Sequence, residues 1–189
     1  MEFNGIILCG GRSKRMGTDK ALLQLGGVSF LERVIALMTP ICDRVLISGN
    51  SSDYKSFGLE IIEDEFEDSG ALSGLFSGLK ASDKDWNLIL SCDTPLVDLE
   101  VVNHLKDHVK TGQSVVHART NQDNHPLIGF YNKACVSKLE SAIKIGNLKL
   151  QPAVNKCDPL KVLMEADLAE KLVNINTPDD YRTLLNRYG

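Results

Sequence analysis

The sequence of 189 residues lacks paired cysteines, long apolar runs and an excess of positive charge. Its five cysteines are widely spaced, with no C-x-x-C pair, which argues against a disulfide framework or a zinc site. No apolar run approaches the roughly 18 residues that would span a bilayer, and Met-Glu-Phe-Asn-Gly at the start lacks the basic region of a signal peptide. The net charge of -4 argues against a basic nucleic-acid-binding surface over the whole chain. We expect a soluble cytoplasmic protein that binds neither membrane nor nucleic acid.

What the sequence does contain is enough apolar material for an ordinary core. Hydrophobic residues make up 43% of the chain and charged residues 24%, so neither a metal nor a disulfide is needed for folding. The length fits one domain, and no repeat or linker interrupts it. We therefore expect a single domain over residues 1–189.

Short apolar runs alternate with helical patterns along the chain. Runs rich in Ile, Val and Leu predict strands, and capping signals such as Ser29-x-x-Glu32 and Thr177-Pro178 predict helix starts. The alternation predicts an α/β, Rossmann-like fold with a mostly parallel, twisted sheet flanked by helices on both faces. The predicted strands are 5–8, 45–48, 59–62, 87–90, 114–117, 127–131 and 161–164, and the predicted helices are 29–40, 71–80, 98–109 and one that opens at 177–180.

The segment directly after the first predicted strand has the composition of a phosphate-binding loop. Its glycines remove side-chain bulk, so that backbone N–H groups can turn toward an anion. The spacing is neither that of a Walker A loop nor that of the dinucleotide motif G-x-G-x-x-G. A basic surface loop is the alternative, which the position after a buried strand disfavours. The glycines are Gly10, Gly11 and Gly17, and the cations are Arg12, Lys14, Arg15 and Lys20.

A second candidate site follows the predicted strand 87–90, where the chain reads Ser-Cys-Asp-Thr-Pro. Proline restricts Thr94 to extended conformations, so Asp93 stands on a stiff turn at the carboxyl edge of the sheet. Mg²⁺ binds through one or two carboxylates together with substrate phosphates. Asp93 could instead cap a turn or helix, but beside the cationic glycine loop a site for a nucleoside triphosphate and magnesium is the better interpretation.

These motifs also carry a resemblance to a known family. The chain resembles the nucleotidyltransferases that activate molybdopterin. Its Gly10-Gly11, where other members carry Ala-Gly, resembles the sequence of the guanylyl branch, the molybdenum cofactor guanylyltransferase family. Matching segments follow in the same order and extend the likeness over residues 4–185. They are 8–22, 62–64, 70–75, 92–95, 125–127 and 174–178.

The resemblance implies a fold of the nucleotide-diphospho-sugar transferase type and a defined reaction. GMP would pass from GTP to the terminal phosphate of molybdopterin, with release of pyrophosphate and a requirement for Mg²⁺ as cofactor. GTP, molybdopterin or the molybdenum cofactor, and proteins that deliver molybdopterin would be the partners. The resemblance assigns Arg15, Lys20 and Asp93 to catalysis, Asp93 also to the metal, Leu8, Cys9, Gly10, Gly11, Lys20, Ser48, Asn50, Asp64, Gly74 and Asp93 to GTP, and His125, Lys149, Asn174 and Asn176 to the acceptor.

Several alternatives stay open at this point. Asn176 could act as a helix N-cap instead of touching substrate. Lys149 is the one cation in the stretch 147–151, where the family often carries arginine. A cytidylyltransferase or a sugar-1-phosphate nucleotidyltransferase would share the loop and the aspartate. A nucleotide-binding module without turnover is the alternative outside enzymes.

Overall fold

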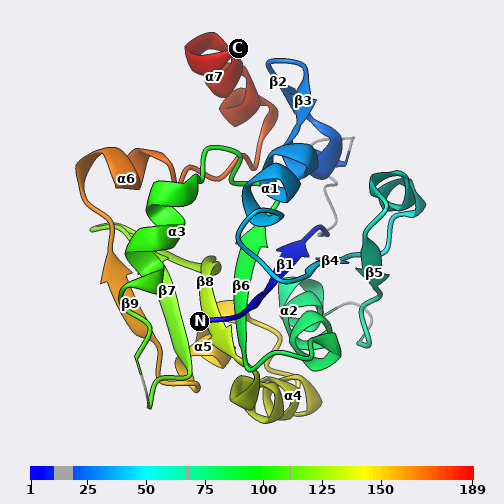
Figure 1. The fold of residues 1–189 in the computed structure, drawn as a ribbon, viewed down its shortest axis with the longest axis vertical. Coiled ribbons are helices and arrows are strands. Elements are labelled where there is room, and N and C mark those ends of the chain that lie inside the picture. The colour runs from blue at the N-terminus through cyan, green and yellow to red at the C-terminus, as the bar shows by residue number, and fades with distance from the viewer. Residues whose placement is uncertain (11–18, 67–68, 111) are drawn as a thin grey trace.

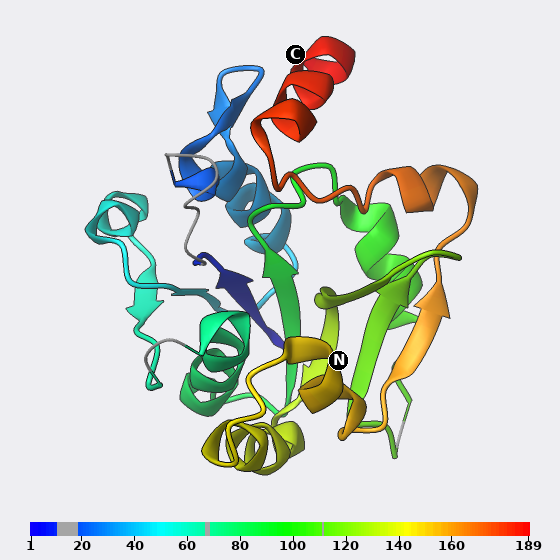
Figure 2. The ribbon, with the colours of Figure 1, turned by 180° about the vertical axis from the view of Figure 1, so that it is seen from behind.

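The computed structural model describes residues 1–10, 19–66, 69–110 and 112–189. Its centre is a seven-stranded sheet in the order β5-β4-β1-β6-β8-β7-β9 (Figures 1 and 2). Within this sheet β8 alone is antiparallel to both of its neighbours, and the other six strands share one direction. The mostly parallel sheet is therefore confirmed. The strands are β1 (Asn4–Leu8), β4 (Val45–Ser48), β5 (Glu60–Ile62), β6 (Trp86–Ser91), β7 (Val115–Arg119), β8 (Asn124–Asn132) and β9 (Leu160–Leu163).

Both faces of the central strands are buried. In β1, Ile7 packs into the core on one face of the sheet and Ile6 into the core on the other. Strands covered on both sides have no solvent-facing positions, so they read as continuous apolar runs instead of alternating ones. This is why all seven predicted strands are found, with shifts of only a few residues at their ends.

Helices cover the two faces, as predicted. The face with Ile7 is covered by α1 (Phe30–Met38), α3 (Leu99–Lys106) and α6 (Ala166–Glu170), which lie toward the viewer in Figure 1. The face with Ile6 is covered by α2 (Gly70–Ala81), α4 (Val136–Lys144) and α5 (Leu150–Asn155), which lie toward the viewer in Figure 2. Short 3₁₀ turns are η1 (Lys20–Leu22), η2 (Ser52–Phe57) and η3 (Lys133–Cys135).

A small third core lies near the C-terminus. It joins α7 (Pro178–Tyr188) to a hairpin formed by β2 (Gln24–Leu25) and β3 (Val28–Ser29). The sequence does not predict this hairpin, because two-residue strands carry no alternating pattern. The predicted helix start at Thr177 is confirmed, with its hydroxyl accepting from the Asp180 N–H and proline at the first helical position.

One predicted helix needs correction, and three helices are new. The helix that opens at Asp98 ends at Lys106 and does not include Val109. There the backbone tightens into turns, in which the Val109 N–H donates to the Lys106 carbonyl at 3.0 Å. The helices α4, α5 and α6 were not predicted; α5 and α6 span only six and five residues, too short for a helical period to show.

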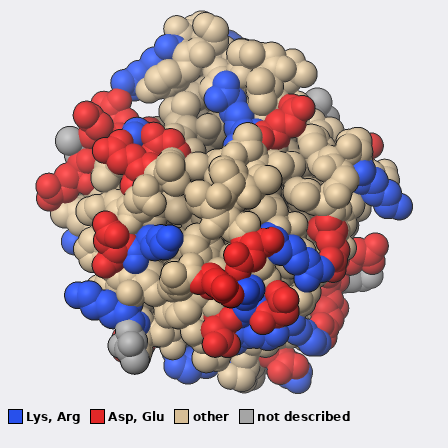
Figure 3. Space-filling view, viewed as in Figure 1, with Lys and Arg blue, Asp and Glu red and all other residues tan. Residues whose placement is uncertain are grey.

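The surface agrees with the mixed charge of the sequence. On the face shown in Figure 3, basic and acidic side chains lie next to one another around a largely uncharged centre. Lys171, for example, lies 2.6 Å from a carboxylate oxygen of Asp98 and 2.7 Å from one of Glu100. Among the described helices, none has the length and apolar composition needed to cross a bilayer.

Candidate functional site

Six of the ten residues predicted to bind GTP line one pocket at the carboxyl ends of the strands; Lys20, Asn50 and Asp93 do not line it, and Gly11 lies outside the described residues. Strand β1 contributes its last residue and the two that follow, β4 its last residue, and α2 three residues near its start. Neighbouring parallel strands end at the same edge of a sheet, so residues far apart in sequence meet there. The pocket, here called the nucleotide pocket, is lined by Leu8, Cys9, Gly10, Ser48, Asp64, Gly70, Ala71, Gly74, Ser91 and Leu127.

Backbone hydrogen bonds hold these strand ends together. The Cys9 N–H donates to the Ser48 carbonyl at 2.8 Å, and the Cys92 N–H donates to the Leu8 carbonyl at 3.2 Å. Gly49 follows β4, and a Cβ placed there would lie 2.0 Å from the Cys9 carbonyl oxygen. Sequence reasoning missed Gly49, because nothing in the local pattern reveals that a neighbouring strand end passes so close.

The wall of the nucleotide pocket contains a small polar network. The Ser48 hydroxyl donates to the Gly74 carbonyl at 3.0 Å, and a Cβ on Gly74 would lie 3.0 Å from that hydroxyl and 3.4 Å from an oxygen of Asp64. Burial raises the pKa of Asp64, and a hydrogen bond with Ser48 partly opposes this rise. Gly74 thus leaves room for the side chains of Ser48 and Asp64.

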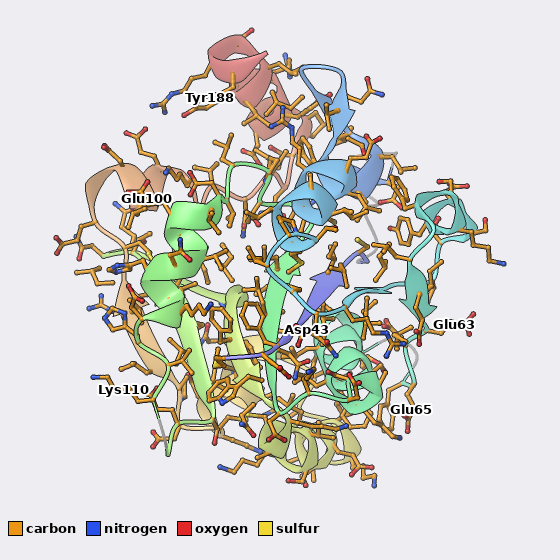
Figure 4. All side chains as sticks on the ribbon, viewed as in Figure 1. Asp43, Glu63, Glu65, Glu100, Lys110 and Tyr188 are labelled. Atoms are coloured by element: carbon orange, nitrogen blue, oxygen red, sulfur yellow. The ribbon has the colours of Figure 1, made fainter. Side chains whose placement is uncertain are left out.

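Asp64 lies in an acidic stretch whose neighbours point elsewhere. Glu63 and Glu65 are exposed (Figure 4), whereas Asp64 between them is half-buried. The Asp64 N–H donates to the amide oxygen of Asn50 at 3.1 Å. Asn50 itself is exposed, so it is joined to the segment that carries Asp64 and does not line the pocket.

Cys9 lies in the pocket wall as a packed thiol. A hydrogen bond with Cys92 and burial raise the pKa of Cys9 well above its usual value. A protonated thiol is a poor nucleophile. None of the five cysteines forms a disulfide.

Asp93 lies at the end of β6, between the nucleotide pocket and the C-terminal segment. Its carboxylate accepts a hydrogen bond from the Ser91 hydroxyl at 2.6 Å. Its backbone carbonyl accepts one from the Ile175 N–H at 2.9 Å, and the Thr94 hydroxyl ties the turn to the Ser91 carbonyl at 2.9 Å. Asp93 therefore stands on a rigid turn, and the residues that flank Ile175 are held beside it.

Lys20 reaches the same C-terminal segment from the opposite end of the chain. Its ammonium donates to the amide oxygen of Asn176 at 2.7 Å. The N-cap of α7 is Thr177, so the alternative role of Asn176 as N-cap is wrong. The backbone N–H of Asn176 donates to the Asp180 carboxylate at 2.9 Å. The side-chain amide oxygen of Asn176 accepts from Lys20.

A second hollow, here called the acceptor cleft after the predicted acceptor-side residues in its lining, includes both neighbours of Ile175, whose N–H donates to the Asp93 carbonyl. It has a volume of about 480 Å³, which lies in the range of small-molecule sites. Residues from the tip between β7 and β8 face residues that follow α6 across it. The lining is Thr120, Gln122, Asp123, Asn124, His125, Ala169, Leu172, Val173, Asn174 and Asn176.

Three of the four predicted acceptor-side residues thus share this cleft. Burial lowers the pKa of His125 below its usual 6.5, although Asp123 and Asp93 oppose the shift. The imidazole is therefore neutral at pH 7. Lys149 is not in the lining: it is exposed next to the first residue of α5. Gly11 and Arg15 lie outside the described residues.

Comparison with known proteins defines the class of the chain. Residues 5–159 match the family model of the MobA-like NTP transferase domain, and the chain belongs to this family. It is therefore a nucleotidyltransferase, and the pocket and cleft lie where an open α/β sheet places its ligands.

Individual relatives show which nucleotidyltransferases the chain is similar to. The chain is 34% identical over 179 residues to a probable molybdenum cofactor guanylyltransferase of Flavobacterium johnsoniae, covering 94% of each chain. Its fold is similar to the crystal structure of the molybdopterin-guanine dinucleotide biosynthesis protein A of Archaeoglobus fulgidus, with a TM-score of 0.83, 22% identity and 98% of both chains covered. The 2-C-methyl-D-erythritol 4-phosphate cytidylyltransferase of Thermus thermophilus shares the fold at a TM-score of 0.71 and 16% identity, covering 99% of this chain and 98% of that one.

Proposed function

We propose that this chain transfers GMP from GTP to the terminal phosphate of molybdopterin and releases pyrophosphate. The observation that carries the proposal is the pair of hollows joined through Asp93: its carboxylate accepts a hydrogen bond from Ser91 of the nucleotide pocket, and its carbonyl accepts one from Ile175, which lies between Asn174 and Asn176 of the acceptor cleft. A transferase that joins two phosphorylated substrates needs two adjacent sites and a charged group at their junction. The names of the relatives supply the identity of the two substrates.

The nucleotide pocket suits a guanine base in this proposal. Asp64 offers a carboxylate that accepts hydrogen bonds, and guanine presents N–H donors at N1 and N2. Cytosine offers a carboxylate only its N4 amino group, and its N3 acceptor would repel the second oxygen. The exposed backbone of Gly10 leaves room at the entrance, since a Cβ there would meet nothing within 4 Å.

The metal in this proposal is Mg²⁺, held by Asp93 and by phosphate oxygens of GTP. The donor set fits, because Mg²⁺ usually takes one or two carboxylates and keeps its other positions for water and phosphate. The described residues contain no cluster of three or more metal-ligating side chains, which agrees with a site completed by the substrate. The ion would neutralise charge on the triphosphate when bound.

The remaining chemistry is positioning and charge compensation. A phosphate monoester with a second pKa near about 6 is mostly dianionic at neutral pH, so the attack on the α-phosphorus needs no general base. The neutral imidazole of His125 therefore orients the acceptor together with Asn174 and Asn176. Lys20 and Arg15 offset the repulsion between the two anions and the charge that grows on the leaving pyrophosphate.

The experiment is a transfer assay with molybdopterin and each of the four nucleoside triphosphates, followed by pyrophosphate release. We expect turnover with GTP that depends on Mg²⁺. Faster turnover with CTP would favour the cytidylyl alternative, and turnover only with a sugar phosphate as acceptor would favour a sugar-1-phosphate nucleotidyltransferase. Nucleotide binding without pyrophosphate release would favour the non-catalytic module.

Lys20 offers a sharper test of the same proposal. We expect Lys20→Ala to lower kcat at least about a hundredfold, the size expected for loss of a cation aimed at transition-state charge. Lys55→Ala is the matched control, because Lys55 is an exposed cation on η2, and exposed charges contribute below about 1 kcal/mol. If kcat fell equally in both variants, and salt affected both losses equally, Lys20 would act only by general attraction of anions.

A further inference from the structure

We propose that Tyr54 is a positioning residue that sets the place of Lys20 through a hydrogen bond to Asp19. The Tyr54 hydroxyl donates to the Asp19 carboxylate at 2.6 Å, across 35 positions of sequence. Tyr54 touches neither hollow, and it follows β4, whereas Lys20 opens η1. The inference rests on the proposed function, in which the Lys20 ammonium faces the triphosphate.

Lys20 depends on an external anchor because its own helix is too short to fix it. The turn η1 has three residues, and a single helical turn forms at a net cost in conformational entropy. Asp19 is the N-cap of η1: one carboxylate oxygen accepts from the Ala21 N–H at 3.0 Å. Its other oxygen accepts from Tyr54, so one carboxylate joins the turn to a separate part of the chain.

Tyr54 itself is fixed to the frame of the sheet. Its side chain is 2% exposed, and its ring lies so close to Gly49 that a Cβ there would approach within 2.9 Å of a ring carbon. Gly49 in turn packs on the carbonyl of Cys9, next to the bond between β1 and β4. Burial raises the pKa of Tyr54, and the bond to Asp19 adds to the rise, so the phenol remains the donor at physiological pH.

The far end of Lys20 is held as well. Its ammonium donates to Asn176, whose own N–H is held by Asp180 at the start of α7. Lys20 is therefore held at two points, its backbone within the turn that Asp19 caps and its ammonium by Asn176. A hydrogen bond from a hydroxyl to a carboxylate is short and strong, and a displacement of about 1 Å in a catalytic group can cost about a hundredfold in rate. Loss of the Tyr54 hydroxyl should thus act on the chemical step more than on nucleotide binding.

The test compares Tyr54→Phe with Tyr181→Phe in the complete chain. Both changes remove one hydroxyl that makes one hydrogen bond, and that of Tyr181 goes to the Gln24 carbonyl at 2.7 Å, between α7 and the β2–β3 hairpin. For Tyr54→Phe we expect kcat to fall about tenfold while KM for GTP stays within about threefold. For Tyr181→Phe we expect kcat within about twofold of the wild type.

A double-mutant cycle separates positioning from general loosening. If Tyr54 acts through Lys20, adding Tyr54→Phe to Lys20→Ala should change kcat by less than about twofold, because the group to be positioned is gone. An unchanged kcat in Tyr54→Phe would overturn the inference. So would an equal loss in both backgrounds, or a loss confined to KM.

The same assays keep the inference apart from the proposed function. An active wild type with GTP and an unaffected Tyr54→Phe variant would leave the function standing and remove the inference. A wild type that prefers another nucleoside triphosphate would overturn the guanylyl assignment, and the cycle would then be measured with that nucleotide. A wild type that is inactive with all four nucleotides would overturn both.

Discussion

The nucleotide pocket and the acceptor cleft lie side by side but are built in different ways. The pocket is formed where hydrogen-bonded parallel strands end, and its walls include the buried residues Leu8, Cys9 and Ser48. The cleft is formed by the tip between β7 and β8 and by the segment that follows α6, and much of its lining is polar and exposed. The geometry of the sheet therefore determines the pocket, whereas loops determine the cleft. Mutations should reveal this contrast as losses of folding and chemistry in the first region and losses of acceptor binding in the second.

The largest effect should come from the closest approach in the pocket frame. In Gly49→Ala the new Cβ would lie 2.0 Å from the Cys9 carbonyl oxygen, so the strand ends must separate. We expect the free energy of unfolding to fall by about 4 kcal/mol, at the exceptional end of single substitutions, as measured by urea denaturation. Gly10→Ala is the control, since its Cβ would meet nothing within 4 Å; similar losses in both variants would contradict the account of the frame.

Asp93 lies at the boundary between the two regions. Asp93→Asn preserves the size of the side chain but replaces a carboxylate with a poor ligand for a hard dication. We expect magnesium-dependent turnover to fall at least about a hundredfold with the melting temperature unchanged. Turnover that stays within about threefold of the wild type, which is under about 1 kcal/mol of barrier, would remove the proposed metal role.

His125 tests the acceptor cleft alone. We expect His125→Ala to raise KM for the acceptor about tenfold, equivalent to about 1.4 kcal/mol of binding, and to leave KM for GTP unchanged. His104→Ala is the control, because His104 lies on α3 and its ring contact is with His108. A rise in KM for GTP in His125→Ala would contradict the assignment of nucleotide binding and acceptor binding to two separate regions.

The smallest expected effect is a pH dependence of the free energy of unfolding, which comes from a buried histidine near the cleft. His117 is fully buried on β7, and burial lowers its pKa below the usual 6.5. The unfolded chain therefore takes up the proton first as the pH falls, and the free energy of unfolding should decline as the pH is lowered from neutral through 6.5. We expect His117→Gln to weaken this decline in urea denaturation. An identical pH profile in the variant would assign the decline to other groups, such as His125 or the carboxylates.

The strands that lead to the pocket can be predicted from the sequence for a physical reason. Strands such as β1 are buried on both faces, so their apolar runs mark them, and the residue after each strand then falls at the edge where ligands bind. The direction of β8 has no such mark, because the run 127–131 reads alike in a parallel or an antiparallel strand. The partnership of Lys20 with Asn176, and that of Tyr54 with Asp19, depend on segments 156 and 35 positions apart. Such pairs follow from the fold and from no local pattern.

The reversed strand β8 has a consequence for how such a protein can diversify. Because β7 and β8 form a hairpin, the chain reaches the cleft and returns within the short stretch 120–123, without a crossover helix. The register of the pairing between β7 and β8 shifts between His117 and Ala118, just below this tip. The Tyr131 hydroxyl donates a hydrogen bond to the Pro126 carbonyl at 2.5 Å. Residues could therefore be inserted at the tip, changing the side chains that line the acceptor cleft, while the hydrogen-bonded strand ends that form the nucleotide pocket keep their alignment.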